Sequence, residues 1–577
     1  MDFNENQVAA EAGDTVFDFK GNLADKSKTG GWLAAGLILS SELAERVCAI
    51  GISMNLVTYL VGNLHLPTSR SANIVTNFLG TLNLAPLLGG FLADAKFGRY
   101  LTVVVSATIA AAGTGMLTIA TSLRSMLPPE CDDVRREGHE CIEASGRQLA
   151  LLFASLYTIA AGSGGVKANV SGFGSDQFDG NNPKEEKAMV FFFNWFYFGI
   201  SLGSLFAVTV LVYIQDYVGR GWGYGISAAI WVAALAVLIG GTPRYRFRRP
   251  KGSPITVVGH VLWGAWRKRQ MAYPDHATRL NGYDSATVPH TDRFRFLDKA
   301  AILEESHSTS APSETRSSFV QSRPHTSTVT EVEEVKMVLK LLPIWATCIL
   351  FWTVYSQMTT FSVEQATYMN RKIGSFTYPS GSLSFFLFAA ILLITSLNEK
   401  LLVPLARRLT RNVGGITCLQ RIGIGLTYSI LSMIVSAVVE KKRRDLNEEN
   451  VILSVFSLVP QFFLVGTGEG FVYVGQLEFF IQEAPERMKS MSTGLFLSTI
   501  SMGFFSSSVL VTLVDKATNG GWIKNDLNNS RLEYFYAMLA VLGVVNIVVF
   551  VIFARRHRYK VKKYEINNQH EDKSMEC

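Results

Sequence analysis

The feature of this 577-residue sequence that most constrains its fold is a series of long, apolar, nearly charge-free runs. A helix needs about 20 apolar residues to cross a bilayer core, and inside lipid every backbone polar group must bond within its own helix. The runs therefore predict membrane-spanning helices. Two sets of six are expected, at residues 31–63, 72–95, 100–123, 147–171, 188–214 and 221–241, and at residues 336–368, 379–402, 416–440, 451–481, 490–515 and 532–556.

The polar stretches divide the chain into five parts. Charged residues are only 18% of the sequence, and they gather between the apolar runs. Residues 306–330 are rich in serine and threonine and lack apolar periodicity, so part of the linker around them is expected to be disordered. We expect a cytoplasmic segment at 1–30, six-helix bundles at 31–241 and 336–556, a cytoplasmic linker at 242–335 and a basic cytoplasmic tail at 557–577.

Basic residues indicate which side of the membrane the loops face. Lysine and arginine are enriched in cytoplasmic loops, and both the linker and the tail are strongly basic. An even number of spans places both termini on that side. Residues 441–444, Lys-Lys-Arg-Arg, fall on the opposite side and break the rule. No cleavable signal peptide is recognisable in the first 30 residues, so the first span is expected to direct membrane insertion.

The loops and motifs of the sequence give few signs of covalent, metal-binding or catalytic chemistry. Cys131 and Cys141 lie ten positions apart in one predicted outer loop, where an oxidising compartment permits a disulfide; two free surface thiols are the alternative. No phosphate-binding loop, metal-ligand pattern or nucleophile motif is recognisable. The sequence therefore predicts no metal site, no cofactor, no nucleic-acid partner and no enzymatic activity.

Five ionisable residues inside the predicted spans are the main functional signal. A charge there costs from about 2.5 to more than 10 kcal/mol unless it is paired or hydrated. Glu42, Glu45 and Arg46 share one face of the first span, while Lys167 and Glu469 lie among small residues in the fourth and tenth. Because a buried carboxylate can take up a proton, these residues are candidates for proton-coupled, alternating-access transport. A buried ion-pair network that only fixes helix packing is the alternative.

Three motifs in order resemble those of known transporters. Residues 42–46, Glu-Leu-Ala-Glu-Arg, resemble the ExxER motif of proton-coupled peptide and nitrate transporters. Residues 89–99 resemble the loop signature after the second span in the major facilitator superfamily. Residues 196–205 resemble the fifth-span signature of peptide transporters, with Ser201 where asparagine is usual. The chain is thus similar to the plant nitrate transporter/peptide transporter family, above all to its dual-affinity nitrate transporter subgroup.

The resemblance implies an all-α membrane protein with the twelve-helix major facilitator fold and proton symport. It implies that Glu42, Glu45 and Arg46 couple proton movement with Lys167 as their salt-bridge partner, and that Glu469 links gating of the second half. It also implies the plasma membrane as location, with the vacuolar membrane as runner-up. Partners in this reading are protons, nitrate or chloride, membrane lipid and a regulatory kinase, and a homodimer is left open.

The loop between the second and third spans is expected to act at the inner gate. Gly98 permits a tight turn, and Asp94 and Arg99 can bond neighbouring helix termini. A simple positive-inside anchor is the alternative for Arg99. Thr102 follows Arg99 at the spacing of a basophilic kinase site, and a threonine here resembles the affinity switch of the dual-affinity subgroup. A threonine that merely caps or packs is the alternative.

The seventh span bears on the transported solute. Tyr355 stands where nitrate-selective relatives are expected to carry histidine, and tyrosine can donate a hydrogen bond but supplies no charge. Thr359, four residues on, could share the anion. We therefore expect a proton-coupled nitrate importer of low affinity that also admits chloride. Ordinary lining is the alternative for Tyr355; a carrier of peptides, plant hormones or other organic solutes, or a nitrate receptor, are the alternatives for the protein.

Overall fold

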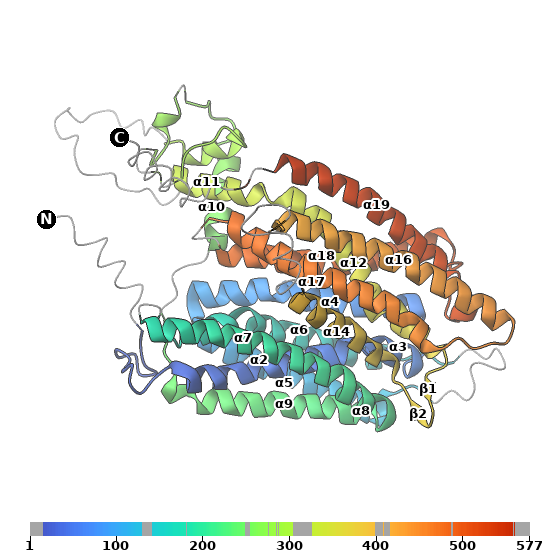
Figure 1. Ribbon diagram of the computed structural model, residues 1–577. Coiled ribbons are helices and arrows are strands. Elements are labelled where there is room, and N and C mark those ends of the chain that lie inside the picture. The colour runs from blue at the N-terminus through green and yellow to red at the C-terminus, as the bar shows by residue number, and fades with distance from the viewer. Residues whose placement is uncertain are drawn as a thin grey trace, which may run out of the picture. The chain divides into compact units, whose positions relative to one another are not determined.

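The protein is nearly all helical and divides into two compact units (Figure 1). Unit 1 comprises Met1–Gly252, Ala346–Gln476 and Phe496–Ile552, and unit 2 comprises Ser253–Trp345, Leu477–Leu495 and Phe553–Cys577. The computed structural model describes residues 16–129, 141–179, 182–248, 254–303 without 275, 284, 285 and 287, 326–397, 408, 416–485, 489–557 and 559.

Eleven stretches among the described residues are long and apolar enough to cross a membrane. They are Thr68–Phe97, Arg99–Ser122, Gly146–Ser175, Phe191–Tyr217, Arg220–Gly240, Val329–Thr367, Ser380–Leu397, Cys418–Glu448, Val455–Glu483, Ser492–Ala517 and Leu532–Arg556. Helix α2 (Gly31–Ser53), the first expected span, falls outside this set because three charged residues interrupt its apolar sequence. With α2 included, the described residues contain twelve stretches of spanning length, the number expected from the sequence.

The first half of unit 1 is a helical bundle in which α2 contacts α6, α7 and α9, and α5 contacts α6 and α9. Its elements are α2, α3 (Leu56–Gly62), α4 (Thr68–Leu92), η1 (Ala93–Phe97), α5 (Arg99–Ser122), η2 (Arg124–Met126), α6 (Gly146–Ser175), α7 (Pro183–Phe206), η3 (Ala207–Leu211), α8 (Val212–Tyr217), α9 (Arg220–Gly240) and η4 (Thr242–Arg244).

The second half of the chain supplies the remaining spans. Its elements are α12 (Leu342–Thr359), α13 (Phe361–Thr367), η7 (Ser380–Leu383), α14 (Ser384–Leu397), α16 (Cys418–Glu448), η9 (Val455–Leu458), α17 (Val459–Glu483), α18 (Lys489–Ala517), η11 (Leu527–Asn529) and α19 (Leu532–Arg556). Strands β1 (Lys372–Ile373) and β2 (Phe376–Thr377) form a short antiparallel hairpin between α13 and α14.

The predicted first span, residues 31–63, is two helices rather than one. Met54 and Asn55 separate α2 from α3. Asn55 Nδ2 donates to Asp216 Oδ1 at 2.8 Å, and the Asn55 carbonyl accepts from Arg220 at 3.3 Å. Polar partners on α8 and α9 thus satisfy the backbone and side chain at the break.

Glycines bring α4 and α6 into backbone contact. A Cβ on Gly89 of α4 would lie 2.5 Å from the Cα of Gly165, and one on Gly164 would lie 2.6 Å from the backbone of Ala85. No side chain fits at either position, so only glycine allows this approach. Asn169 Nδ2 then donates to the Gly89 carbonyl at 3.2 Å and ties the two helices together.

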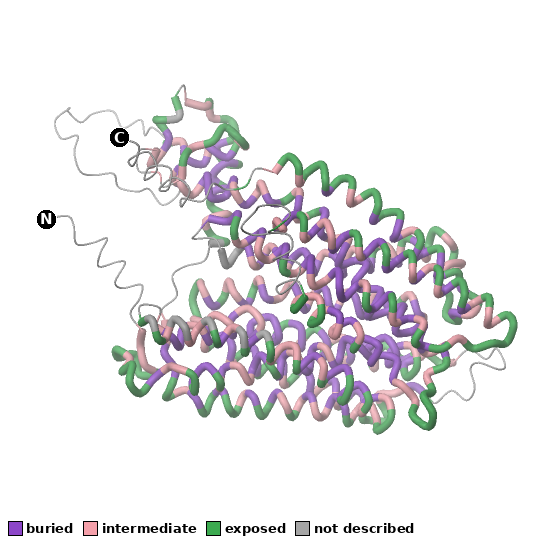
Figure 2. Tube along the Cα trace, in the orientation of Figure 1, coloured by how far each residue is buried: buried purple, intermediate pink, exposed green. Residues whose placement is uncertain are grey.

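The outward faces of the spans are apolar, as a lipid environment requires. Figure 2 shows buried residues between the helices and exposed residues along their outer surfaces. Helix α19 exposes Val541, Val545 and Val548, which lie on one face at spacings of four and three. An apolar surface of this kind is typical of a helix that faces lipid on one side.

Helix α16 explains the exception to the charge rule at residues 441–444. Arg443 forms a buried, two-point ion pair with Glu440, in which Nε and NH2 each donate at 2.8 Å. Arg444 pairs with Glu533 of α19. Two of the four basic residues are therefore neutralised within the fold, and α16 continues about two turns beyond the expected end at residue 440.

Residues 242–248 of the expected linker belong to unit 1, whereas most of its described part, from residue 254 on, folds as the main body of unit 2. Its elements are α10 (Pro254–Arg267), η5 (Ala277–Arg279), η6 (Arg295–Ala301) and α11 (Val329–Leu339). Small apolar residues form its core: Val261, Ala265, Leu280, Leu297, Ala300, Ala301, Val329, Val332, Val335 and Val338. Residues 304–325, which hold most of the serine- and threonine-rich stretch, lie outside the described residues.

Buried ion pairs complete this core. Lys336 Nζ lies 2.7 Å from Asp298 Oδ1 and 2.7 Å from Glu333 Oε1, and His290 Nε2 lies 3.1 Å from Asp298 Oδ2. His290, Asp298 and Glu333 are close enough together to hold a metal ion. The Lys336 ammonium pairs with both carboxylates and offsets one of their two negative charges.

Replacing Glu440 by leucine should lower the thermal unfolding temperature of the purified protein. The change leaves the Arg443 guanidinium buried without its counter-charge, which costs about 3–5 kcal/mol. Glu448→Leu, an exposed position on the same helix, is the control. The double variant Glu440→Leu/Arg443→Met should recover most of the loss, and equal unfolding temperatures for all variants would contradict the assigned pairing.

Candidate functional site

The three charged residues of α2 lie together in the bundle interior. Arg46 Nε is 3.3 Å from Glu42 Oε1 and 3.6 Å from Glu45 Oε2. Glu42 is 2% exposed and Glu45 is 0% exposed. One oxygen of Glu42 and both of Glu45 have no hydrogen-bond partner among the described residues. Two buried carboxylates thus share one guanidinium, which leaves acceptor capacity that a proton can satisfy.

Lys167 of α6 lies beside this cluster but bonds a neutral group. Its Nζ donates to Asn83 Oδ1 of α4 at 2.9 Å, while its charge interacts electrostatically with Glu42, Glu45 and Arg46. Across the part of the chain that the structure describes, Lys167 forms no salt bridge with either glutamate. The salt bridge implied by the resemblance is therefore not formed in this conformation and stays a prediction for another one.

Glu469 of α17 reaches the same charged region from the second half of the chain. Its carboxylate interacts electrostatically with Arg46, and Oε2 is buried without a hydrogen-bond partner among the residues described. Arg46 also interacts electrostatically with Tyr473, four residues further along α17. Arg46 therefore joins acidic groups of both halves, as a site between two bundles requires.

Aromatic side chains surround Tyr355 of α12. Its ring contacts Trp352 edge-on at 5.5 Å and Phe504 of α18 at 6.2 Å, and Trp352 also contacts Tyr473 at 6.4 Å. The Tyr355 hydroxyl forms no hydrogen bond with any described residue and remains available to a ligand. Thr359 is different, because its hydroxyl donates to the Ser356 carbonyl at 2.9 Å.

The predicted gating loop is built as a tight turn at the end of α4. Gly98 adopts φ +74°, a left-handed conformation that glycine adopts without strain. Arg99 NH1 donates to Asp176 Oδ2 at 2.6 Å at the end of α6, and Arg248 Nε lies 3.4 Å from the other oxygen of that carboxylate. Asp94, in η1, has no ion-pair partner among the described residues. Arg99 thus ties two helix ends rather than serving only as an isolated charge.

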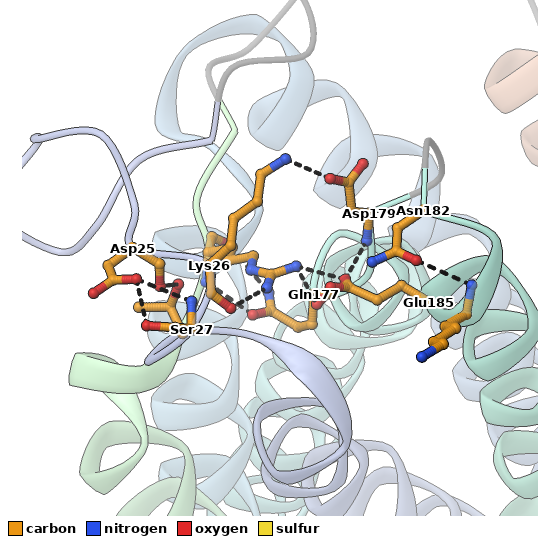
Figure 3. Close-up of polar contacts among 10 residues, drawn as sticks. Asp25, Lys26, Ser27, Gln177, Asp179, Asn182 and Glu185 are labelled. Atoms are coloured by element: carbon orange, nitrogen blue, oxygen red, sulfur yellow. Dashed lines mark hydrogen bonds and ion pairs between the residues drawn. The ribbon is translucent and has the colours of Figure 1, made fainter.

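A second polar cluster lies near these helix ends, and the sequence motifs did not single it out. Arg246 NH1 donates to Glu185 Oε2 at 2.8 Å and to the Gln177 carbonyl at 3.1 Å, and Lys26 pairs with Asp179 (Figure 3). These contacts hold the segment before α2 and the segment after α9 against the ends of α6 and α7. The exposed Asp25 nearby has a lowered pKa because Ser27 donates two hydrogen bonds to it.

The two halves are hydrogen-bonded to each other at the opposite end of the bundle, where α4 begins. Asn73 Nδ2 donates to Thr512 Oγ1 at 2.9 Å, and Thr68 Oγ1 donates to the Asn525 carbonyl at 3.3 Å. Within the membrane-spanning part, Ser501 Oγ donates to the Gly80 carbonyl at 2.7 Å. The halves are thus held together at the end of the bundle far from Arg99.

Comparison with known proteins decides the family. The POT family model matches residues 100–527. The chain belongs to the POT family. Protein NRT1/ PTR FAMILY 6.4 of Arabidopsis thaliana is 63% identical over 555 residues, which are 96% of this chain and 93% of that protein. Protein NRT1/ PTR FAMILY 6.2 of the same plant is 49% identical over 548 residues, 93% of each chain.

The fold is likewise that of POT transporters. A crystal structure of an auto-inhibited POT family peptide transporter matches with a TM-score of 0.67 at 21% identity, and the match covers 92% of this chain and 98% of that one. This POT family member is therefore a proton-coupled, multi-pass membrane transporter of the plant NRT1/PTR type.

The predicted phosphorylation site and the predicted disulfide of this POT transporter concern Thr102, Cys131 and Cys141. Thr102 is 7% exposed, and its hydroxyl donates to the Gly98 carbonyl at 2.9 Å, so a kinase could reach it only after this helix start opens. Phosphorylation of Thr102 stays a prediction. Cys141 is disulfide-bonded, and Cys131, its predicted partner, lies outside the described residues.

Asn83 should matter for stability because it accepts the hydrogen bond of Lys167. Asn83→Ala removes the acceptor of the partly buried Lys167 amine, which costs about 1–3 kcal/mol, and the unfolding temperature should fall. In a Lys167→Met background the same change should cost far less, because methionine needs no acceptor. Asn77→Ala on the same helix is the control. Equal losses in both backgrounds would show that the two side chains are not coupled.

Proposed function

We propose that this protein imports nitrate together with protons by alternating access, with low affinity, and that it also admits chloride. The observation that carries the proposal is the buried group formed by Glu42, Glu45 and Arg46, which meets Glu469 from the other half of the chain. Such a group can exchange a proton and at the same time offer positive charge to an anion.

Proton binding can redistribute the ion pairs of this site. With both glutamates ionised, Arg46 is held between them, and its positive charge is compensated. When one glutamate takes up a proton, part of the Arg46 charge is no longer compensated and can attract an anion. Lys167 can then leave Asn83 and pair with the glutamate that remains ionised. One proton therefore changes both the charge of the site and the contact between α2, α4 and α6.

The seventh span supplies a weak anion site in this proposal. The Tyr355 hydroxyl is free to donate one hydrogen bond, and the attractive charge comes from Arg46 or Lys167 rather than from α12 itself. Thr359 can contribute only after it gives up its bond to Ser356. Nitrate and chloride both accept a single hydrogen bond from a hydroxyl, so Tyr355 alone gives little selectivity between them.

In this proposal the gates lie at the two ends of the bundle. We assign Asp94, Gly98 and Arg99 to the inner gate, where the Arg99–Asp176 pair holds α5 and α6 together. Phosphate on Thr102 would break its bond to Gly98 and loosen the start of α5, which supports a regulatory kinase. The proposal places the protein in the plasma membrane with both termini in the cytoplasm, consistent with the basic linker and tail.

Glu42→Gln should abolish proton-driven accumulation of nitrate. Glutamine keeps the size of the side chain and, like the protonated carboxyl, offers one acceptor oxygen and a donor, but it cannot release or take up a proton. Labelled nitrate uptake in oocytes at mildly acidic pH should fall to the level of uninjected cells, whereas nitrate exchange without a proton gradient should persist. Glu448→Gln, an exposed change, is the control. Accumulation that survives Glu42→Gln would reduce the α2 cluster to a structural role.

Tyr355→His should raise selectivity for nitrate over chloride. A histidine can carry a proton and present a planar, charged donor to nitrate, so nitrate uptake should increase several-fold relative to chloride. Tyr428→His, which alters a ring stacked on Phe471 of α17, is the matched control. Unchanged selectivity would show that Tyr355 does not determine the choice between nitrate and chloride. Uptake of a peptide or another organic solute by the wild type, without nitrate or chloride uptake, would overturn the proposed substrate.

A further inference from the structure

We propose that the exposed face of α10 docks on the surface of an anionic membrane, independently of the transported solute. Helix α10 belongs to unit 2, whereas Glu42, Glu45 and Arg46 belong to unit 1. Its lipid-facing residues would be Leu262, Trp263 and Trp266, with Arg267 and Arg269 contacting headgroups.

Helix α10 exposes large apolar side chains in addition to those that it buries in the core of unit 2. On one side Val261 and Ala265 are buried with η6 and α11. On the other side Leu262 is 44%, Trp263 62% and Trp266 56% exposed. Large apolar side chains gathered on one exposed face of a helix mark a docking surface rather than a solvated one.

The chemistry of this face favours a lipid surface. The rings of Trp263 and Trp266 lie 5.1 Å apart, and the Arg269 guanidinium lies 5.0 Å above the Trp266 ring. Residues 254–274 contain no aspartate or glutamate. Indoles partition to the boundary between headgroups and acyl chains, and arginines beside them attract anionic headgroups. The face and its charge therefore complement an anionic leaflet.

The covalent chain keeps a membrane surface within reach. The ion pair with Asp176 holds Arg248 near the end of a membrane span, and only residues 249–253 join Arg248 to α10. A tether of this length gives the bilayer a high effective concentration, whereas a soluble partner must be captured from solution. Two indoles and one leucine bury too little area to hold a soluble partner tightly but are sufficient for a tethered helix.

Docking would restrain the start of the second bundle. Helix α11 shares the core of unit 2 with α10 and continues through Lys340 and Leu341 into α12, which carries Tyr355. A membrane-held α10 therefore restrains the polypeptide at the beginning of the seventh span.

A nitroxide on α10 tests the proposal in the full-length protein. Leu262→Cys keeps both tryptophans, and Phe296→Cys, an exposed position of η6 in the same unit, is the depth control. Both are made in a Cys577→Ser background and reconstituted in phosphatidylcholine with and without phosphatidylserine. In the anionic bilayer the label at residue 262 should be more accessible to oxygen than to a water-soluble nickel complex, and the label at residue 296 should show the reverse.

Two sets of variants connect the signal to the proposed contacts. Trp263→Ala/Trp266→Ala should return the label at residue 262 to water. Arg267→Gln and Arg269→Gln should each lower the docked fraction in anionic bilayers about fivefold, whereas Arg279→Gln on η5 should not. A label at residue 262 that stays in water in the anionic bilayer overturns the proposal. The proposal is also overturned if the label is protected from the nickel complex only in native membranes, because a protein partner would then cover this face.

Discussion

The enclosure of three ionisable side chains, two of them fully buried, on one membrane helix is the constraint on which this structure depends. Glu42, Glu45 and Arg46 cannot face lipid, so α2 must be covered on all sides that bear them, and α6, α7 and α9 contact it. Glycines 89, 164 and 165 permit α4 and α6 to meet at backbone distance. The same packing requirement therefore places Lys167 beside the glutamates and creates the site.

The fold and the members of the charged site could largely be predicted from the sequence, because both follow from local signals. Apolar runs of spanning length give the helices, and spacings of three and four place Glu42, Glu45 and Arg46 on one face. Contacts between helices were beyond such reasoning. Nothing near Lys167 in the sequence points to Asn83, which lies on another helix, and nothing near residues 441–444 reveals that Arg444 pairs with Glu533.

The fold of unit 2 could not be predicted from the sequence for a related reason. Its core combines segments that flank the serine- and threonine-rich stretch, so that Val261 packs in the same core as Val332, and the pairing of two segments so far apart in the sequence cannot be read from either one alone. The polar cluster of Lys26, Asp179 and Arg246 likewise joins three distant segments. Within unit 1 that cluster joins segments that flank the membrane helices, and the charged site of α2 keeps carboxylate oxygens without a hydrogen-bond partner among the described residues.

Linkage between nitrate binding and proton binding tests the central claim most directly. Calorimetric titration of the purified wild-type protein with nitrate, repeated at one mildly acidic pH in buffers of different ionisation enthalpy, measures the protons taken up per anion bound. The account predicts net proton uptake by the protein when nitrate binds. Nitrate binding with the same heat in every buffer would contradict it, because the buried carboxylates would then play no part in anion binding.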